Sequence, residues 1–160
     1  MTNIVLLSDG TGNSSASPFK TNVGRFYQAD DSLPPADATL PRQIVYYDNG
    51  VGTENFKPLA ALGGAFGIGV WNNVKDLYTF VCRSYQLGDQ VYGFGFSRGA
   101  YTIRVLVGLI DHQGLVTFDT EAELERNAIA AYRAFRKEAF ATWIPWVRAG
   151  RFLRDQLISF

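Results

Sequence analysis

A serine between two glycines is the group in this sequence best suited to chemistry. Residues 95–99 read GFSRG, which fits the G-x-S-x-G pattern of a nucleophile elbow, a sharp turn between a strand and a helix that lifts a serine hydroxyl above a sheet. Residues 90–96 are largely apolar, and apolar residues recur at helical spacing after the serine. This context predicts that Ser97 is a nucleophile. The alternative is a small residue in a structural turn.

Acyl transfer also needs donors that stabilise the negative charge on the carbonyl oxygen of the transition state. The backbone N–H of Arg98, directly after the serine, is the first expected donor. The loop DGTGN at residues 9–13 follows the first apolar segment, and Gly10 or Thr11 is the candidate second donor. We expect Asp9 to support this loop; the alternative is a polar turn whose side chains only cap backbone groups.

Two glycine-containing loops follow the second apolar segment, at residues 48–53 (DNGVGT) and 63–69 (GGAFGIG). The first begins at the carboxyl end of a predicted strand, the edge where open α/β sheets bind ligands. We expect Asp48 to support the site there. Each loop could shape a substrate pocket; the alternative is a flexible connection before a helix.

The sequence contains a single histidine, His112, and a general base must lie near the serine. If residues 98–110 are helical, the helical rise places His112 roughly 20 Å from the Ser97 hydroxyl, against about 3 Å for proton transfer. We therefore expect His112 to be a helix C-terminal residue, where positive charge is favourable, and not the catalytic base.

Two other interpretations of the opening segment fail on the residues themselves. The D-x-D-G-T loop of an aspartate-nucleophile phosphatase requires an aspartate where Leu7 stands. A dinucleotide fingerprint requires a third glycine where Ser15 stands, and no helix pattern follows at once. We expect no cofactor and no metal at this site.

The elements that must position these groups alternate between strand and helix. Continuous apolar runs predict strands buried on both faces, and apolar residues at helical spacing predict helices. Thr120 and Glu123 have the spacing of a capping box before the last helix. The predicted strands are residues 3–8, 42–47 and 90–96, and the predicted helices are residues 22–28, 70–85, 98–110 and 121–140. This order predicts a three-layer α/β domain with a parallel sheet.

Composition excludes several classes of protein. The 160 residues include 15 basic and 15 acidic side chains, so no net charge favours nucleic acid. The single cysteine, Cys82, excludes an internal disulfide, and its apolar helical setting predicts a buried structural thiol. No signal peptide or membrane span is predicted, so we expect a cytoplasmic protein or one exported by a secretion apparatus without a signal peptide. Arg148, Arg151 and Arg154 predict a helix that solvates its arginines; the alternative is a helix lying on a membrane.

Three ordered segments together resemble a particular family. SDGTGN at residues 8–13, YYDNGVGT at 46–53 and GFGFSRGAYTIR at 93–104 resemble the bacterial and fungal α/β-hydrolases that include phospholipase effectors of type VI secretion systems. The resemblance implies an α/β-hydrolase core over residues 1–115 with Ser97 as the nucleophile, and carboxylic esters or phospholipid acyl esters as substrates. Residues 116–160 would begin a lid or an insertion.

The triad acid and histidine of such hydrolases come later in the chain than the serine. We therefore expect residues 1–160 to be the amino-terminal part of a hydrolase that is inactive without the rest. Contact with a membrane surface during catalysis and self-association through an exposed sheet edge are expected. The alternative function is a catalytically incomplete α/β module that binds a lipid or a protein partner.

Overall fold

A short parallel sheet forms the centre of the molecule. The computed structural model describes residues 1–10, 13, 18–29, 41–50 and 65–139. Strands β1 (Thr2–Ser8), β2 (Arg42–Asp48) and β3 (Gln90–Gly95) pair in parallel in the order β2-β1-β3. Ser8 pairs with Asp48 on one side and with Gly95 on the other, so the three strands end level with one another. The bounds of each predicted strand are confirmed to within one residue at either end. The prediction that the strands are buried on both faces holds for β1 but is wrong for β2, which is partly exposed, and for β3, which is largely exposed.

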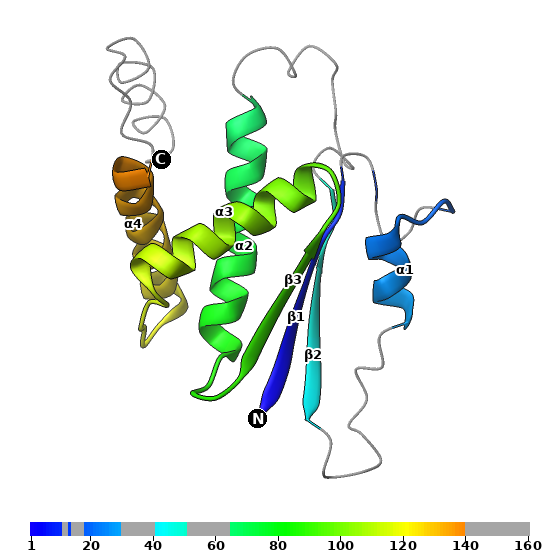
Figure 1. Ribbon diagram of the computed structural model, residues 1–160. Coiled ribbons are helices and arrows are strands. Elements are labelled where there is room, and N and C mark those ends of the chain that lie inside the picture. The colour runs from blue at the N-terminus through cyan, green and yellow to red at the C-terminus, as the bar shows by residue number, and fades with distance from the viewer. Residues whose placement is uncertain (11–12, 14–17, 30–40, 51–64, 140–160) are drawn as a thin grey trace.

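Helices cover both faces of the sheet, and the alternation of β1 shows why. Val5 and Leu7 pack on Val23 of α1 (Asn22–Ala29), whereas Ile4 and Leu6 face the opposite cluster. That cluster is built by α2 (Ala65–Ser84) and α3 (Arg98–Gln113), with α4 (Glu121–Ala139) packed outside them. Figure 1 shows α1 on one side of the sheet and the other three helices on the other side. The predicted α/β class with a parallel sheet is confirmed.

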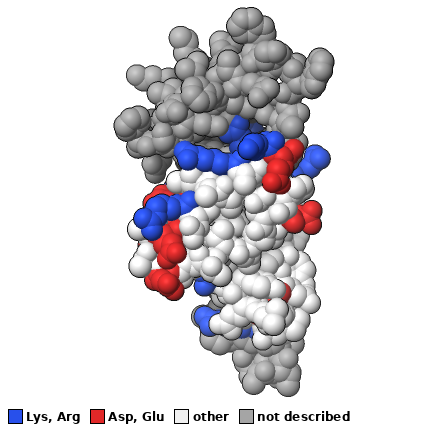
Figure 2. All heavy atoms as spheres, turned by 90° about the vertical axis from the view of Figure 1, so that its left-hand side faces the viewer, with Lys and Arg blue, Asp and Glu red and all other residues white. Residues whose placement is uncertain are grey.

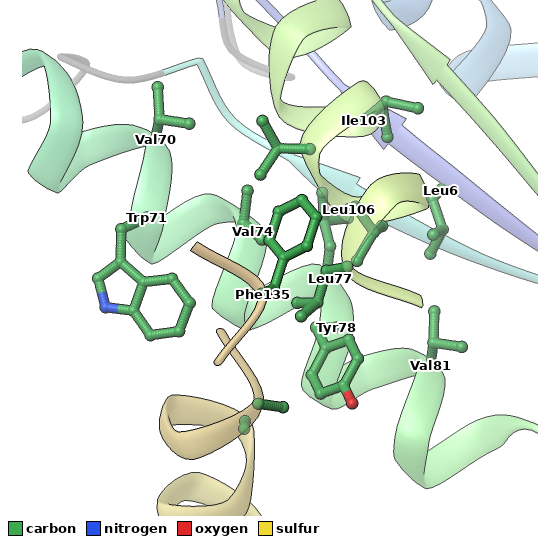
Figure 3. Packing of buried hydrophobic residues seen from close by; sticks show 14 of the residues in the cluster. Leu6, Val70, Trp71, Val74, Leu77, Tyr78, Val81, Ile103, Leu106 and Phe135 are labelled. Atoms are coloured by element: carbon green, nitrogen blue, oxygen red, sulfur yellow. The ribbon is translucent and has the colours of Figure 1, made fainter. Parts of the chain in front are cut away.

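The main hydrophobic core lies between the sheet and the three helices on that face. Phe135 of α4 is buried in the same cluster as Val74 and Leu77 of α2 and Leu106 of α3 (Figure 3). Leu77 and Val74 have no exposed surface, as is also true of Ile4 on β1. The helix after residue 120 is therefore attached to the core by apolar burial, the main favourable term in folding. The boundary predicted at residue 115 stays a prediction.

One helix starts earlier than predicted. Residues 63–69 were expected to form a loop, but α2 begins at Ala65 and includes Gly67 and Gly69; residues 63–64 lie outside the described part. Each glycine costs a helix about 1 kcal/mol relative to alanine. Burial of Val70, Trp71 and the apolar residues that follow stabilises the helix and outweighs this cost. Adding a turn to an existing helix also costs far less free energy than starting a new helix.

The ends of α3 and α4 follow the sequence signals. Gly114 stands just past α3 with a positive φ of 68°, and its N–H donates to the oxygen of Ile110. The Thr120 hydroxyl accepts a hydrogen bond from the N–H of Glu123, whose carboxylate accepts one from the N–H of Asp119. The predicted capping box is thus formed, with its return bond one residue earlier than usual.

The outer surface of α4 carries both signs of charge. Two exposed ion pairs join it to α2, between Lys75 and Glu125 and between Arg83 and Glu121. Figure 2 shows basic and acidic side chains close together around an uncharged area on this side of the molecule. Among the described helices, none is long and apolar enough to span a membrane. Arg148, Arg151 and Arg154 lie outside the described residues.

Candidate active site

The strand order places the candidate site between β1 and β3. From β1 the chain moves to β2 on one side, and from β2 it returns through α2 to β3 on the other side of β1. The direction of winding therefore changes between β1 and β3. In open α/β sheets, ligands bind outside the carboxyl ends of the strands at such a point. Asp9 and Gly10 follow β1 there, and Ser97 follows β3.

Ser97 has the backbone of a strained turn. Its φ of 53° and ψ of −119° make it the only residue other than glycine with a positive φ among those the structure describes. Its side chain is exposed, makes no capping hydrogen bond, and stands directly before Arg98, the first residue of α3. Backbone strain of this kind is frequent at functional sites, where the surrounding structure enforces it.

The two glycines of the motif lie where the backbone leaves no room for a side chain. A Cβ on Gly95 would lie 2.5 Å from the backbone nitrogen of Ala100. A Cβ on Gly99 would lie 2.0 Å from the backbone oxygen of Ser8. The N–H of Phe96 also donates to that Ser8 oxygen, at 3.1 Å. The turn therefore packs directly against the end of β1.

The loop after β1 is anchored by a buried carboxylate. Asp9 is 2% exposed, and its Oδ1 accepts the N–H of Gly10 at 2.7 Å. Its Oδ2 accepts the hydroxyls of Thr21, at 2.7 Å, and Tyr47, at 2.6 Å. Gly10 in turn lies against the elbow, because a Cβ there would meet the ring of Phe96 at 2.8 Å.

Asp48 lies at the end of β2 and joins the sheet to α2. Its Oδ2 accepts the hydroxyl of Ser8, at 2.7 Å, and the side-chain amide of Asn73, at 2.5 Å. Burial raises the pKa of Asp48 from its usual 3.8 to about 6, although both hydrogen bonds oppose the rise and the nearby charge of Asp76 adds to it. This carboxyl can therefore change its protonation state at mildly acidic pH.

The structure brings some of the predicted site residues together. Ser97, Arg98, Gly10 and Asp9 lie where the ends of β1 and β3 meet. Asp48 lies one strand away and reaches this point through Ser8. Thr11 lies outside the described residues, as do residues 51–53 of the loop after β2.

His112 lies at the end of α3 opposite Ser97. Fifteen residues of helix at 1.5 Å each put the two roughly 22 Å apart. Its Nδ1 is 2.9 Å from the backbone oxygen of Gly108, and its ring packs against Phe135. The prediction of a helix C-terminal residue is confirmed.

Four residues of this network were not found from the sequence. Thr21 and Tyr47 hold Asp9, and Ser8 and Asn73 hold Asp48. Only Thr21 carried a usable signal, because it stands at the N-cap of α1 and accepts the N–H of Gly24 at 3.0 Å. Nothing in the sequence indicates that Asn73, inside a helix, would meet the end of β2.

Residues 2–146 match a family model described as the catalytic domain of Tle1-like phospholipase effectors of type VI secretion systems. The chain belongs to this family. An uncharacterized protein of the yeast Saccharomyces cerevisiae is 33% identical over 151 residues, which cover 86% of this chain and 21% of that protein. The chain thus spans about a fifth of the length of this relative. No solved structure matches the present chain.

The description of the Tle1-like family agrees with the geometry around Ser97. The family description names a phospholipase and a catalytic domain, which agrees with the class of reaction that an exposed serine on a strained turn can carry out. The motifs that first indicated the family, at residues 8–13, 46–53 and 93–104, all fall inside the matched range.

Proposed function

We propose that Ser97 is the nucleophile of a serine hydrolase that cleaves carboxylic esters, with phospholipid acyl esters as the substrate class. The observation that supports this most directly is the strained, exposed Ser97 at the point between β1 and β3 where the winding reverses. The Tle1-like family supplies the phospholipase chemistry.

The reaction proceeds in two steps. The Ser97 oxygen attacks the ester carbonyl carbon while its proton passes to a general base. The tetrahedral intermediate then expels the alcohol, which takes up that proton, and leaves an acyl-enzyme. In the second step water attacks the acyl carbonyl and gives a proton to the base. The tetrahedral intermediate then releases the carboxylic acid, and the base returns that proton to the Ser97 oxygen.

Backbone amides would stabilise the oxyanion in both steps. Arg98 begins α3, so its N–H belongs to the first turn, where the helix carries partial positive charge. The second donor would come from the loop after β1. The N–H of Gly10 donates to Asp9 in this structure and would have to exchange partners to serve, so Thr11 is the better candidate.

The general base must come from elsewhere than the remote His112. We propose that the triad acid and histidine lie beyond the chain, as expected from the order of triad residues in α/β-hydrolases. The runner-up function is a catalytically incomplete module that binds a lipid or a protein partner. It is favoured by the same observation, the distance between Ser97 and the single histidine.

The experiment compares two serine variants of the full-length protein on p-nitrophenyl esters and on phospholipid vesicles. Ser97→Ala should lower kcat by at least about 1,000-fold, because the nucleophile is lost. Ser84→Ala, at the far end of α2 from the site, should leave kcat unchanged. A fluorophosphonate should label the protein at Ser97, as peptide mass spectrometry would show.

Turnover that persists in Ser97→Ala would overturn the proposal. Lipid binding by the full-length protein with no turnover, and no label at Ser97, would favour the binding module instead.

A further inference from the structure

We infer that Asp9 is a positioning residue, whose buried carboxylate fixes the backbone against which the Ser97 elbow is packed. The inference deepens the proposed function and rests on Ser97 being the nucleophile. Asp9 does not touch the reacting atoms. It acts through Gly10, Phe96 and Gly99.

The carboxylate of Asp9 joins three separate parts of the chain. It accepts hydrogen bonds from its own loop, at the N–H of Gly10, from the N-cap of α1, at Thr21, and from β2, at Tyr47. The N–H of Asp9 also donates to the backbone oxygen of Asp48, at 3.0 Å. With 2% of its surface exposed, Asp9 has little access to water, and buried charge is tolerated only when hydrogen bonds replace the lost water.

The two side-chain donors to this carboxylate are held in place themselves. Thr21 accepts the N–H of Gly24 at the start of α1, and the ring of Tyr47 packs against Tyr27 of the same helix. Burial raises the pKa of Tyr47 above its usual value, and the hydrogen bond to Asp9 is the second largest cause of the rise. The phenol therefore stays protonated and remains a donor at any physiological pH.

The backbone on both sides of the Asp9 carboxylate touches the elbow. Gly10 lies against the ring of Phe96, the residue before the nucleophile, with 2.8 Å between the place of a Cβ and Cδ1. The backbone oxygen of Asp9 lies 2.7 Å from the place of a Cβ on Gly99, two residues after it. The close approach at Gly99 is between backbone atoms, so a shift of the Asp9 carbonyl group acts directly on the turn that holds Ser97, whereas the approach at Gly10 acts through the ring of Phe96.

An amide cannot replace this carboxylate without loss. Oδ1 faces an N–H and Oδ2 faces two hydroxyls. An asparagine can keep its oxygen on the N–H of Gly10 only if its NH₂ faces the two hydroxyls, which must then turn to accept and lose this acceptor for their own protons. Asp9→Asn should therefore move the loop without removing its volume. Misplacing a catalytic group by about 1 Å can cost about 100-fold in rate.

The experiment measures kcat and KM of the full-length protein on a p-nitrophenyl ester, well below the unfolding temperature. Asp9→Asn should lower kcat by about 10- to 100-fold with KM little changed. Tyr47→Phe, which removes one donor, should lower kcat less, by about 3- to 10-fold. The rate of fluorophosphonate labelling at Ser97 should fall with kcat in both variants.

Tyr78→Phe is the matched control. Tyr78 lies on α2 and is fully buried, whereas Tyr47 is partly buried. The Tyr78 hydroxyl donates to the backbone oxygen of Gly114 at 2.8 Å, just past the end of α3 that is far from Ser97. It should lower the unfolding temperature about as much as Tyr47→Phe and leave kcat unchanged.

Three outcomes separate the ideas. Unchanged kcat in Tyr47→Phe and Asp9→Asn would overturn the positioning role, as would a rise in KM alone. Activity that survives Ser97→Ala would overturn the proposed function itself. If Asp9→Asn does not fold, the comparison of Tyr47→Phe with Tyr78→Phe still decides.

Discussion

The two carboxylates near the site differ in which of their oxygens accept hydrogen bonds. Asp9 accepts donors on both oxygens, whereas Ser8 and Asn73 both donate to Oδ2 of Asp48. An amide oxygen can accept two donors as well, and it carries no charge that burial would penalise. Asp48→Asn can therefore remove the charge at this position and keep both hydrogen bonds.

The charge of Asp48 should make stability fall as pH rises through the mildly acidic range. Its pKa is about 6 in the folded protein and about 3.8 when unfolded, so between these values the folded state binds more protons. The free energy of unfolding then decreases with pH, by about 1–3 kcal/mol in total, and the loss is complete above pH 6. Asp48→Asn should not show this contribution.

Urea unfolding of the wild type and Asp48→Asn at pH 4 and pH 7 measures the effect. The difference between the two proteins removes the contributions of other groups, including Asp76, whose pKa burial also raises. Between pH 4 and pH 7, the free energy of unfolding of Asp48→Asn should rise relative to that of the wild type. An equal change in both proteins would contradict the prediction.

Local geometry makes part of the candidate site predictable from the sequence. Gly95, Ser97 and Gly99 are predictable because a sharp strand-to-helix turn imposes their spacing. Thr21 and Tyr47 are not, since they reach Asp9 from 12 and 38 residues away in the sequence. Contacts of this kind depend on how elements pack, which a single sequence does not encode locally.

The first turn of α3 packs very closely against the end of β1. A Cβ on Gly99 would lie 2.0 Å from the oxygen of Ser8 and 2.7 Å from that of Asp9. Both atoms belong to the backbone of the central strand and its loop, so neither can move aside as a flexible side chain would. The first turn of α3 can approach β1 only without a side chain at this position.

Gly99→Ala should therefore destabilise the protein by more than about 3 kcal/mol, or prevent folding, because α3 must move off β1. Gly114→Ala is the control: its φ of 68° disfavours alanine, but nothing lies within 4 Å of a Cβ there. It should lose about 1–3 kcal/mol, from the backbone conformation alone. The free energies of unfolding in urea give both values, and equal losses would show that the close contact is unimportant.

The strands and most helix boundaries could be predicted because local patterns decide them. Continuous apolar runs predict the bounds of all three strands, although only β1 is buried, and Gly114 and Thr120 mark where α3 ends and α4 begins. The start of α2 could not be predicted, since Gly67 and Gly69 disfavour a helix locally. Packing against the sheet and α3 overrides that preference.

At the scale of the whole molecule, the outer edge of β3 is open among the described residues. In that part of the chain β3 pairs only with β1. Val91, Tyr92, Phe94 and Phe96 on or beside it are 40–50% exposed. A strand with free backbone donors and exposed apolar side chains is a template for pairing with another chain.

The 160-residue chain should therefore self-associate, and a charge on this edge should reduce the association. Val91→Lys places a lysine on β3, while Val107→Lys places one on the exposed surface of α3, where the side chain is 60% exposed. Sedimentation velocity over a range of concentrations should show association in the wild type and in Val107→Lys, and less in Val91→Lys. A wild-type chain that stays monomeric at high concentration would refute the prediction.

The left-handed backbone at Ser97 means that the candidate site is built at the expense of the fold. Residues in such conformations raise the free energy of the folded state by about 1–3 kcal/mol, a sizeable part of the 5–15 kcal/mol that holds a typical domain together. Glycine would relieve most of that strain but would carry no hydroxyl. A search for more stable variants would therefore select against the serine that we propose as the nucleophile, so stability and the proposed activity would compete at this one position.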